Sequence, residues 1–349
     1  MDATLLILTK TLLKKIIFLS VIFSSLIVFA QKDTLKLRNG NMLIGEIKGM
    51  DKSVLTYKTP YSDKDFKIKW HEVAEIYSNR YFIISLENGK RFSSTINSVA
   101  DKKGIVYLDA GMSSFEDEIH HVIYLDPIGK SYLGRLTLDV DVGITITKSN
   151  NYKQFTTTFS GSYVADKWQS STYFNSVLTR QDGIEDLTRV EGNIDLLYYL
   201  PSSWFLQTEA EYLGNDEQKL DLRSTYKVGG GYFFKRNNDL YFGGGTGVAF
   251  NYENYSDDSP DKQSTELYAG MAYNKYDIGD ISFLSNFVYY YSLTEDSRYR
   301  VDFSVDLKYD LPHDFYIKAN LTYNFDSQPI EGASKDDYIT QLSFGWEFN

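Results

Sequence analysis

The carboxyl-terminal part of the chain alternates apolar and polar residues over long segments that are separated by turn residues. Residues 136–146 place an aliphatic side chain at every second position, and residues 299–311 repeat the pattern with Tyr, Val, Phe and Leu. Period-two alternation predicts β-strands with one apolar face and one polar face. A segment with six or seven apolar residues at every second position is longer than the strands that are usual in soluble sheets. The pattern therefore predicts a transmembrane antiparallel β-barrel over residues 134–349, in which lipid-facing and lumen-facing side chains alternate.

About twelve such segments follow one another. Their centres lie near Val140, Phe159, Phe174, Ile194, Thr208, Val228, Thr246, Ala269, Phe287, Val305, Ala319 and Phe344. Alternate connections are tight, and the connections between them are mostly longer and acidic, such as residues 251–262 and 326–337, as expected for short periplasmic turns and outer loops. The segments near Ser170 and Glu266 alternate poorly, so ten or fourteen strands stay possible.

The polar positions of these segments predict a charged lumen. They are Asp139, Asp141, Arg189, Glu191, Asp195, Glu209, Glu211, Asp221, Arg223, Lys227, Asp302, Asp306 and Lys308. The acids outnumber the bases, so an open pore would favour cations. Opposite charges on neighbouring strands could instead pair and close the lumen, with Arg223 facing Glu209 or Glu211. Both alternatives stay open at this point.

The last segment resembles the carboxyl-terminal assembly signal of outer-membrane barrels. Its aromatic residues Phe344, Trp346 and Phe348 stand at alternate positions. Two features depart from that signal: Ser343 replaces a usual glycine, and Asn349 follows the final aromatic residue. This segment implies the barrel-assembly machinery as a partner. Aromatic residues also cluster toward the ends of other segments, where amphipathic rings suit a lipid–water boundary.

The first thirty residues have the organisation of a secretory signal peptide. Lys10, Lys14 and Lys15 precede an apolar run over residues 16–29. The run is short for a transmembrane helix, so we expect cleavage before Gln31 and exclude residues 1–30 from the fold.

Between the signal peptide and the predicted barrel lies an internal repeat with a spacing of 49 residues. An Asn-Gly pair, a strong hairpin signal, occurs in both copies, at Gly40 and at Gly89. Residues 31–79 and 80–130 are therefore predicted to form two small SH3-like or Sm-like β-units. His71 and His120 occupy equivalent positions, which favours a structural role over metal binding. Such a pair of units is typical of a docking module for a periplasmic protein partner.

Composition narrows the possible functions. The chain has no cysteine, so thiolate metal sites and cysteine nucleophiles are excluded. Its formal charge of −11 disfavours a nucleic-acid partner, which needs a basic surface. The predicted barrel holds one histidine, His313, inside a turn, so we expect no enzyme activity. The acidic run Asp257, Asp258 and Asp261 lacks the ligand spacing of a calcium loop, and no metal or cofactor is expected.

Residues 209–245 resemble a known family. The resemblance rests on Glu209-Ala210-Glu211-Tyr212, Leu220-Asp221-Leu222-Arg223, Gly229-Gly230-Gly231-Tyr232 and Gly243-Gly244-Gly245. These stretches are similar to the "domain of unknown function 481" family of putative salt-induced outer-membrane proteins, which would cover residues of about 134–349. The resemblance implies an outer-membrane location and no established chemistry.

The resulting hypothesis is an outer-membrane protein that contacts lipid and lipopolysaccharide and holds its amino-terminal repeats in the periplasm. Its barrel would be a small cation-preferring channel or a stress-linked structural barrel. The alternative is a secreted or periplasmic β-rich binding protein without a membrane span.

Overall fold

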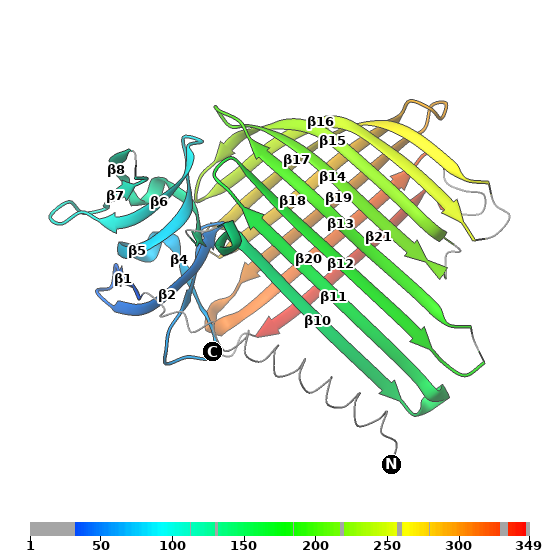
Figure 1. The fold of residues 1–349 in the computed structure, drawn as a ribbon, viewed down its shortest axis with the longest axis horizontal. Helices are drawn as coiled ribbons and strands as arrows, with labels where there is room; N and C mark the ends of the chain where they lie inside the picture. The colour runs from blue at the N-terminus through cyan, green and yellow to red at the C-terminus, as the bar shows by residue number, and fades with distance from the viewer. Residues whose placement is uncertain are drawn as a thin grey trace, which may run out of the picture. The chain divides into compact units, whose positions relative to one another are not determined.

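The computed structural model describes residues 32–346 except 112, 130–131, 184, 217–219, 257–259, 279 and 329–333. The predicted signal peptide over residues 1–30, its cleavage site before Gln31 and Phe348 lie outside the described residues. The described chain is all-β and forms two sheets, joined by a short 3₁₀ turn, η3 (Tyr132–Arg135) (Figure 1). In the described part of the chain, no helical segment has the length and apolar character needed to cross a membrane.

The first sheet contains nine strands and two 3₁₀ turns. They are β1 (Asp33–Leu37), β2 (Met42–Asp51), β3 (Val54–Lys58), β4 (Phe66–Lys69), η1 (Trp70–Glu72), β5 (Val73–Leu86), β6 (Arg91–Ser98), β7 (Ile105–Asp109), β8 (Ser114–Glu118), η2 (Ile119–His121) and β9 (Val122–Ile128). Eight strands follow the order β4-β3-β2-β1-β5-β6-β7-β8, and β9 pairs with both β2 and β5. We call this part, residues 33–128, the amino-terminal module.

The two copies of the repeat turn in the same way. In the first copy Leu37 N–H donates to the carbonyl of Asn41, and in the second Leu86 N–H donates to the carbonyl of Lys90, each at 2.8 Å. Gly40 has φ +88° and Gly89 has φ +82°, a region that favours glycine. The Asn-Gly pairs therefore form tight hairpin turns between β1 and β2 and between β5 and β6.

The two predicted β-units share a strand and a core. Strand β5 runs without a break across the boundary expected between residues 79 and 80. The indole of Trp70 in η1 donates to the carbonyl of Ile119 in η2 at 3.1 Å, which joins the equivalent turns of the two copies. One hydrophobic cluster contains buried side chains from both copies, among them Leu35, Tyr57, Phe82, Ile96 and Leu125.

Asp126 on β9 makes the stability of the amino-terminal module depend on pH. Burial raises the pKa of this carboxyl, although Tyr124 and Arg91 favour its charged form. The stability linked to Asp126 is therefore fully present below the unfolded pKa and is lost as pH rises through the folded pKa. We expect Asp126→Asn to raise the urea midpoint of the module at pH 7. We also expect it to flatten the decline in stability above pH 4, and an unchanged pH profile would contradict this.

The second sheet contains twelve antiparallel strands, each paired with its sequence neighbour. They are β10 (Leu136–Thr147), β11 (Tyr152–Val164), β12 (Trp168–Arg180), β13 (Leu187–Tyr199), β14 (Trp204–Asn215), β15 (Leu220–Arg236), β16 (Leu240–Tyr255), β17 (Lys262–Ile278), β18 (Ile281–Ser292), β19 (Tyr299–Asp310), β20 (Phe315–Asp326) and β21 (Asp336–Trp346). The predicted antiparallel sheet of about twelve strands is confirmed.

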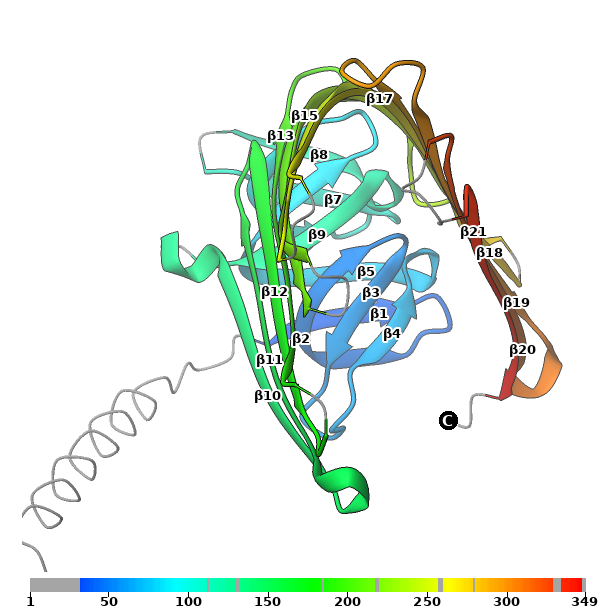
Figure 2. The same ribbon diagram turned by 90° about the vertical axis from the view of Figure 1, so that its right-hand side faces the viewer.

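The twelve-stranded sheet curves into a trough with β10 at one edge and β21 at the other (Figure 2). Among the described residues, no pairing joins β10 to β21. The sheet is open in this structure, so its closure into a barrel stays a prediction.

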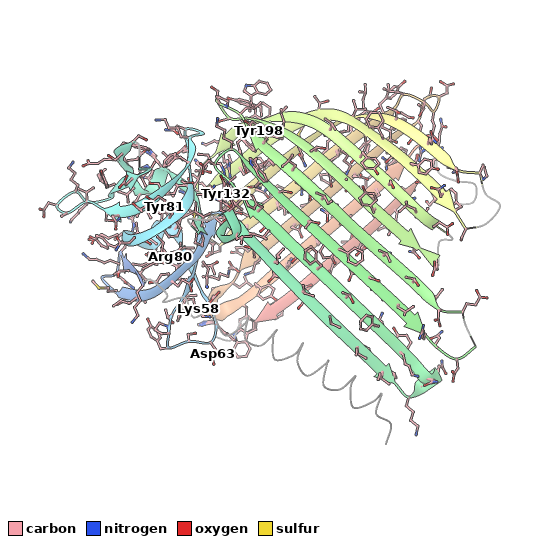
Figure 3. All side chains as sticks on the ribbon, viewed as in Figure 1. Lys58, Asp63, Arg80, Tyr81, Tyr132 and Tyr198 are labelled. Atoms are coloured by element: carbon pink, nitrogen blue, oxygen red, sulfur yellow. The ribbon has the colours of Figure 1, made fainter. Side chains whose placement is uncertain are left out.

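Alternation gives the sheet two different faces, and side chains project from both (Figure 3). On β10 the aliphatic residues Leu138, Val140 and Ile144 share one face, and their exposed fractions lie between 54% and 70%. Cross-strand partners continue this apolar face, as where Val140 lies opposite Phe159. The other face carries the polar positions and is the concave one, because it lines the cavity described below.

The connections at the two ends of the sheet differ. At one end lie the short turns over residues 165–167, 200–203, 237–239, 279–280 and 311–314. At the other end, which we call the loop end, lie the connections over residues 148–151, 181–186, 216–219, 256–261, 293–298 and 327–335. Strands β15 to β17 have 16 or 17 residues, and β16 continues to Tyr255, inside residues 251–262 that were predicted as a loop.

Candidate functional site

The concave face holds a polar cavity of about 800 Å³ near the loop end. Strands β14 to β20 and the β18–β19 loop contribute its walls. Its charged lining residues are Glu211, Arg223, Lys227, Glu253, Lys262, Glu266, Glu295, Arg298, Arg300, Asp302 and Asp326. Six carboxylates thus face five basic groups, and the lining is close to neutral.

The most deeply buried charge in this cavity belongs to Glu266 on β17, which is 1% exposed. Its carboxylate accepts two hydrogen bonds from the guanidinium of Arg300 on β19, at 3.1 and 2.5 Å. The Arg300 guanidinium also lies 4.6 Å from the ring centroid of Tyr290 on β18. Removing one partner of a buried pair costs about 3–5 kcal/mol, because the other charge is left uncompensated. The pair therefore fixes β17, β18 and β19 against one another.

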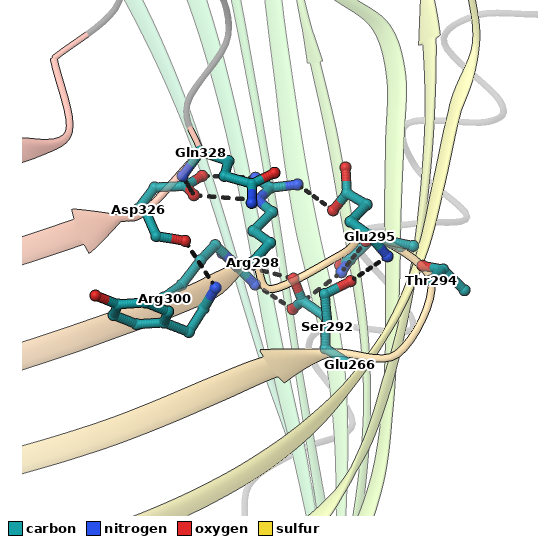
Figure 4. A network of polar contacts seen from close by, with 12 residues as sticks. Glu266, Ser292, Thr294, Glu295, Arg298, Arg300, Asp326 and Gln328 are labelled. Carbon is teal, nitrogen blue, oxygen red and sulfur yellow. Dashed lines mark hydrogen bonds and ion pairs between the residues drawn. The ribbon is translucent and has the colours of Figure 1, made fainter.

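A second arginine ties two loops together beside this pair (Figure 4). Arg298 at the end of the β18–β19 loop donates to Glu295 at 2.5 Å and to Asp326 at 3.1 and 2.6 Å. Asp326 also accepts from the backbone N–H of Gln328 at 2.9 Å. Gln328 in turn donates its side-chain amide to the carbonyl of Asp296 at 2.7 Å. These contacts tie the β18–β19 loop to the end of β20 at the wall of the cavity.

Two further basic residues, Lys227 and Arg223, form ion pairs with carboxylates on neighbouring strands. Lys227 on β15 lies 3.4 Å from a Glu209 oxygen and 3.1 Å from a Glu211 oxygen. Arg223, also on β15, lies 2.6 Å from Glu253 on β16. The prediction that Arg223 faces Glu209 or Glu211 is wrong. Arg223 lies opposite Leu213 on β14 and turns toward the other neighbouring strand, where Glu253 is its direct cross-strand partner.

Comparison with known proteins identifies the family of this sheet. The model of the family described as "Protein of unknown function, DUF481" matches residues 140–348, three-fifths of the chain. The chain belongs to the DUF481 family. The match covers all but the first residues of the twelve-stranded sheet and leaves the amino-terminal module outside, in agreement with the resemblance seen in the sequence.

Two solved structures are similar to this DUF481 protein at low identity. A bacterial polysaccharide outer membrane secretin shares 9% identity over 76% of this chain and 94% of its own, with a TM-score of 0.42. The β-domain of the Bordetella autotransporter BrkA shares 10% identity over 59% of this chain and 94% of its own, with a TM-score of 0.28. No curated protein matches the chain.

The predicted lumen charges of the DUF481 sheet separate into two groups. Glu211, Arg223, Lys227 and Asp302 line the cavity. The others have local polar partners in several cases. These contacts join Asp139 to Ser160, Arg189 to Glu191, Asp195 to Asn193, Asp306 to Asn320 and Lys308 to Asp310. Asp141 lies on β10 opposite Thr158, and Asp221 lies near the start of β15.

Sequence reasoning missed the residues that form the centre of the cavity. Glu253 was assigned to a loop that begins at Asn251, but β16 continues to Tyr255. Glu266 lies in a segment whose alternation is poor. Arg300 was recognisable, because it is two positions from Asp302 in the clearest alternating run and so shares its face. Parity along β19 could therefore have identified Arg300, whereas its partner Glu266 could not be identified in this way.

The carboxyl-terminal strand packs its aromatic residues against β20. The Phe315 ring stacks on Phe344 and Trp346, at centroid distances of 5.4 and 5.9 Å. The Trp346 indole donates to the carbonyl of His313 at 3.1 Å. His313 has φ +64° in its turn, η6 (Pro312–Asp314), and so contributes a backbone carbonyl to this contact.

The amino-terminal module contacts the short turns of the DUF481 sheet, and both belong to one compact unit. The Arg91 guanidinium on β6 lies 4.9 Å from the ring centroid of Tyr124 and 4.5 Å from that of Tyr199 on β13. Asn238 in the β15–β16 turn donates its amide to the carbonyls of His120 and Val122, at 2.7 and 2.9 Å. These contacts place the second copy of the repeat beside the end of the sheet that has the tight turns.

Proposed function

We propose that this protein is an outer-membrane β-barrel whose lumen is closed near the loop end by the ion pairs of the cavity. The observation that carries the proposal is the division of the twelve-stranded sheet into a continuous apolar convex face and a charged, internally paired concave face. The amino-terminal module, two SH3-like repeats, would lie in the periplasm and dock onto the short turns.

The apolar face supports a membrane location. Soluble monomers rarely expose a contiguous apolar patch of more than a few hundred Å², because water does not solvate such a surface favourably. Every strand from β10 to β21 carries exposed large aliphatic or aromatic residues, and on β11, β16 and β20 there is one each, Phe155, Phe250 and Ile317. Strands of 11 to 17 residues are long enough to cross about 30 Å of hydrocarbon at a tilt.

Closure would require β10 to pair with β21. Lipid offers no hydrogen bonds to an open edge, so a spanning sheet must satisfy both edge strands. The even number of strands makes β10 and β21 antiparallel, as this pairing requires. The apolar residues Val140 on β10 and Leu342 on β21 would then lie on one continuous lipid-facing surface.

Cross-linking tests this closure without background, because the chain has no cysteine. Val140→Cys is combined in turn with cysteine at Tyr338, Thr340, Leu342, Phe344 and Trp346 in membranes that contain the assembled protein. A closed barrel gives strong disulfide formation at one position or two adjacent positions of the scan. The absence of cross-links in folded protein would overturn the closed-barrel proposal.

The closed lumen follows from the pairing of charges. Each arginine of the cavity lies within 2.6 Å of a carboxylate oxygen, and Lys227 lies between two carboxylates. Opposite charges that neutralise one another across strands leave no uniform field to attract a permeating ion. We therefore expect the wild-type protein to show no steady conductance steps in a planar bilayer.

The variant Arg300→Glu tests whether the Glu266–Arg300 pair closes the lumen, since it places a second carboxylate against Glu266. We expect steady, cation-selective steps in place of silence, because repulsion separates β17 from β19 and the lining becomes acidic. The matched control is the exchange Glu266→Arg with Arg300→Glu, which restores the pair and the silence. Arg180→Glu, at an exposed loop pair outside the cavity, also leaves the bilayer silent.

Two results would contradict the closed lumen. Wild-type protein with folding confirmed by heat-modifiable gel migration, yet with steady conductance, would favour an open channel. Silence of both wild type and Arg300→Glu would show that this pair does not control the lumen. Loss of the protein from carbonate-washed outer membranes would instead favour a secreted or periplasmic binding protein.

A further inference from the structure

The second 3₁₀ turn of the amino-terminal module brings three metal-ligating side chains together, whereas the first turn offers two, His71 and Glu72. One ligand atom from each of Glu118, His120 and His121 lies within 4.8 Å of those of the other two. The sequence predicted a structural role for His120 because it repeats His71. The fold brings two further ligand groups, one on each side of it along the chain, to the same patch of surface.

We propose that Glu118, His120 and His121 form a binding site for a borderline divalent metal ion of the Zn²⁺ type. Imidazole nitrogen and carboxylate oxygen are the ligands that Zn²⁺ takes in a protein without cysteine. Three protein ligands would leave a fourth position to water. The site lies in the amino-terminal module and does not depend on the barrel or on the ion pairs of its cavity.

Two of the ligands already have the right spacing. His120 Nδ1 and Glu118 Oε2 lie 3.1 Å apart. Two ligands bound at 2.0–2.1 Å to a tetrahedral ion are separated by about 3.3 Å, so the ion would bridge this pair with small side-chain movements. Both side chains are more than half exposed, which leaves the ion a path from solvent.

The third ligand is oriented by a carboxylate behind it. His121 Nδ1 lies 2.7 Å from Asp117 Oδ1. A hydrogen bond from Nδ1–H to Asp117 fixes the tautomer that leaves the Nε2 lone pair free for a metal. Asp117 is only 19% exposed, so this support is held in place. Carboxylates in this position behind a histidine are common in zinc sites and strengthen the ligand.

The first copy of the repeat provides a matched control within the same molecule. At the equivalent positions, 49 residues earlier, the first turn has Lys69 in place of Glu118 and Glu72 in place of His121. Ile68 stands where the supporting Asp117 would be. The first turn therefore offers two candidate ligands, His71 and Glu72, whose Nε2 and Oε1 atoms lie 3.2 Å apart, and no third beside them among the described residues. We expect it to bind no ion.

The bound ion would also strengthen the contact between the module and the sheet. Asn238 donates its amide to the carbonyl of His120 and to that of Val122, which immediately follows η2. Fixing the side chains of η2 around an ion restricts the same backbone that Asn238 binds. Metal binding would thus hold η2 rigid where the β15–β16 turn docks.

The test is a titration of the full-length protein in detergent with Zn²⁺ alone, against a chromophoric chelator. We expect one ion per chain with a dissociation constant on the order of 1 µM. His120→Ala and His121→Ala should each weaken binding by at least about 100-fold, and Asp117→Asn by about 10–100-fold. His71→Ala should leave binding unchanged. Hydrogen exchange resolved by peptide over residues 33–128 shows whether each variant keeps the fold of the module.

Three results would overturn the proposal. The first is wild-type protein that binds no Zn²⁺ at 100 µM. The second is a loss of affinity in His71→Ala as large as in His120→Ala. The third is a double variant, His120→Ala with His121→Ala, that keeps the wild-type affinity and stoichiometry.

Discussion

Replacing Gly247 on β16 with alanine should prevent the twelve-stranded sheet from forming with native stability. A Cβ atom at this position would overlap the backbone carbonyl of Val228 and would lie 2.6 Å from the Cα of Gly229 on β15. The hydroxyl of Tyr268 on β17 would lie 2.7 Å from the same atom. Backbone atoms cannot move aside as flexible side chains do, so we expect a loss of about 3 kcal/mol or more. The urea midpoint of refolding, followed by heat-modifiable gel migration, measures it.

We expect Gly229→Ala to cause the same loss of stability, because Gly229 is the cross-strand partner of Gly247. The Tyr268 side chain passes over both residues, so the two glycines leave room for its ring on the concave face. An aromatic residue that covers glycines on a neighbouring strand stabilises a strongly curved sheet. Tyr268→Ala should then destabilise the sheet less than Gly247→Ala, since it creates space instead of an overlap.

Gly143 on β10 is the matched control. An added Cβ atom there comes no nearer than 3.7 Å to Thr156, an ordinary packing distance. Gly143→Ala should change the urea midpoint by the equivalent of less than about 0.5 kcal/mol. Equal effects at Gly143 and Gly247 would show that glycine supplies conformational freedom in general, and that close approach at Gly247 is not the cause.

These glycines show how far the sequence determines the fold. The alternation over residues 136–147 and 299–311 predicts strands that the structure places at Leu136–Thr147 and Tyr299–Asp310. Such agreement follows because one face must be apolar throughout, and a single shift in register would reverse the faces. The curvature of the sheet could not be predicted in this way. It depends on which strands carry glycine opposite glycine, and that requires the register between β15 and β16.

The candidate site was harder to predict for a related reason. A strand inside a sheet has a neighbouring strand on each side. The amino-acid sequence does not say which of the two supplies the partner of a polar side chain. Arg223 illustrates this, because a register shift between Leu213 and Asn215 alters the β14–β15 pairing just where Arg223 lies. The long side chain of Arg223 reaches Glu253 on the other side instead. The face of the sheet on which Arg223 lies could therefore be predicted from the sequence, but the residue that it pairs with could not.

Replacing Asp33 with alanine should destabilise the amino-terminal module more than any exposed substitution in it. The Asp33 side chain is fully buried. Its carboxylate accepts from the backbone N–H of Ile47 at 2.7 Å, from the Ser78 hydroxyl at 2.5 Å and from the Arg80 guanidinium at 3.1 Å. Arg80, labelled on the first sheet in Figure 3, also donates to the carbonyl of Ile47 at 3.0 Å. One carboxylate thus joins β1, β2 and β5.

Without this carboxylate, three donors lose an acceptor, and one of them is a cation only one-fifth exposed. Breaking a buried charged pair from one side costs about 3–5 kcal/mol, because desolvation of the remaining charge is no longer offset. Asp33→Asn keeps an acceptor oxygen and should lose less. Hydrogen exchange resolved by peptide in the full-length protein measures the effect in the module separately from the barrel.

The control is Lys36→Ala on the same strand, which removes an exposed ion pair with Glu75 at 2.7 Å. Exposed pairs contribute about 0–1 kcal/mol, so protection of the module should change little. Equal losses for Asp33→Ala and Lys36→Ala would mean that burial of the carboxylate is not what stabilises β1. A larger loss at Asp33 with unchanged exchange in β10 to β21 would show that the module owes its stability to its own core, and that the large sheet folds without its support.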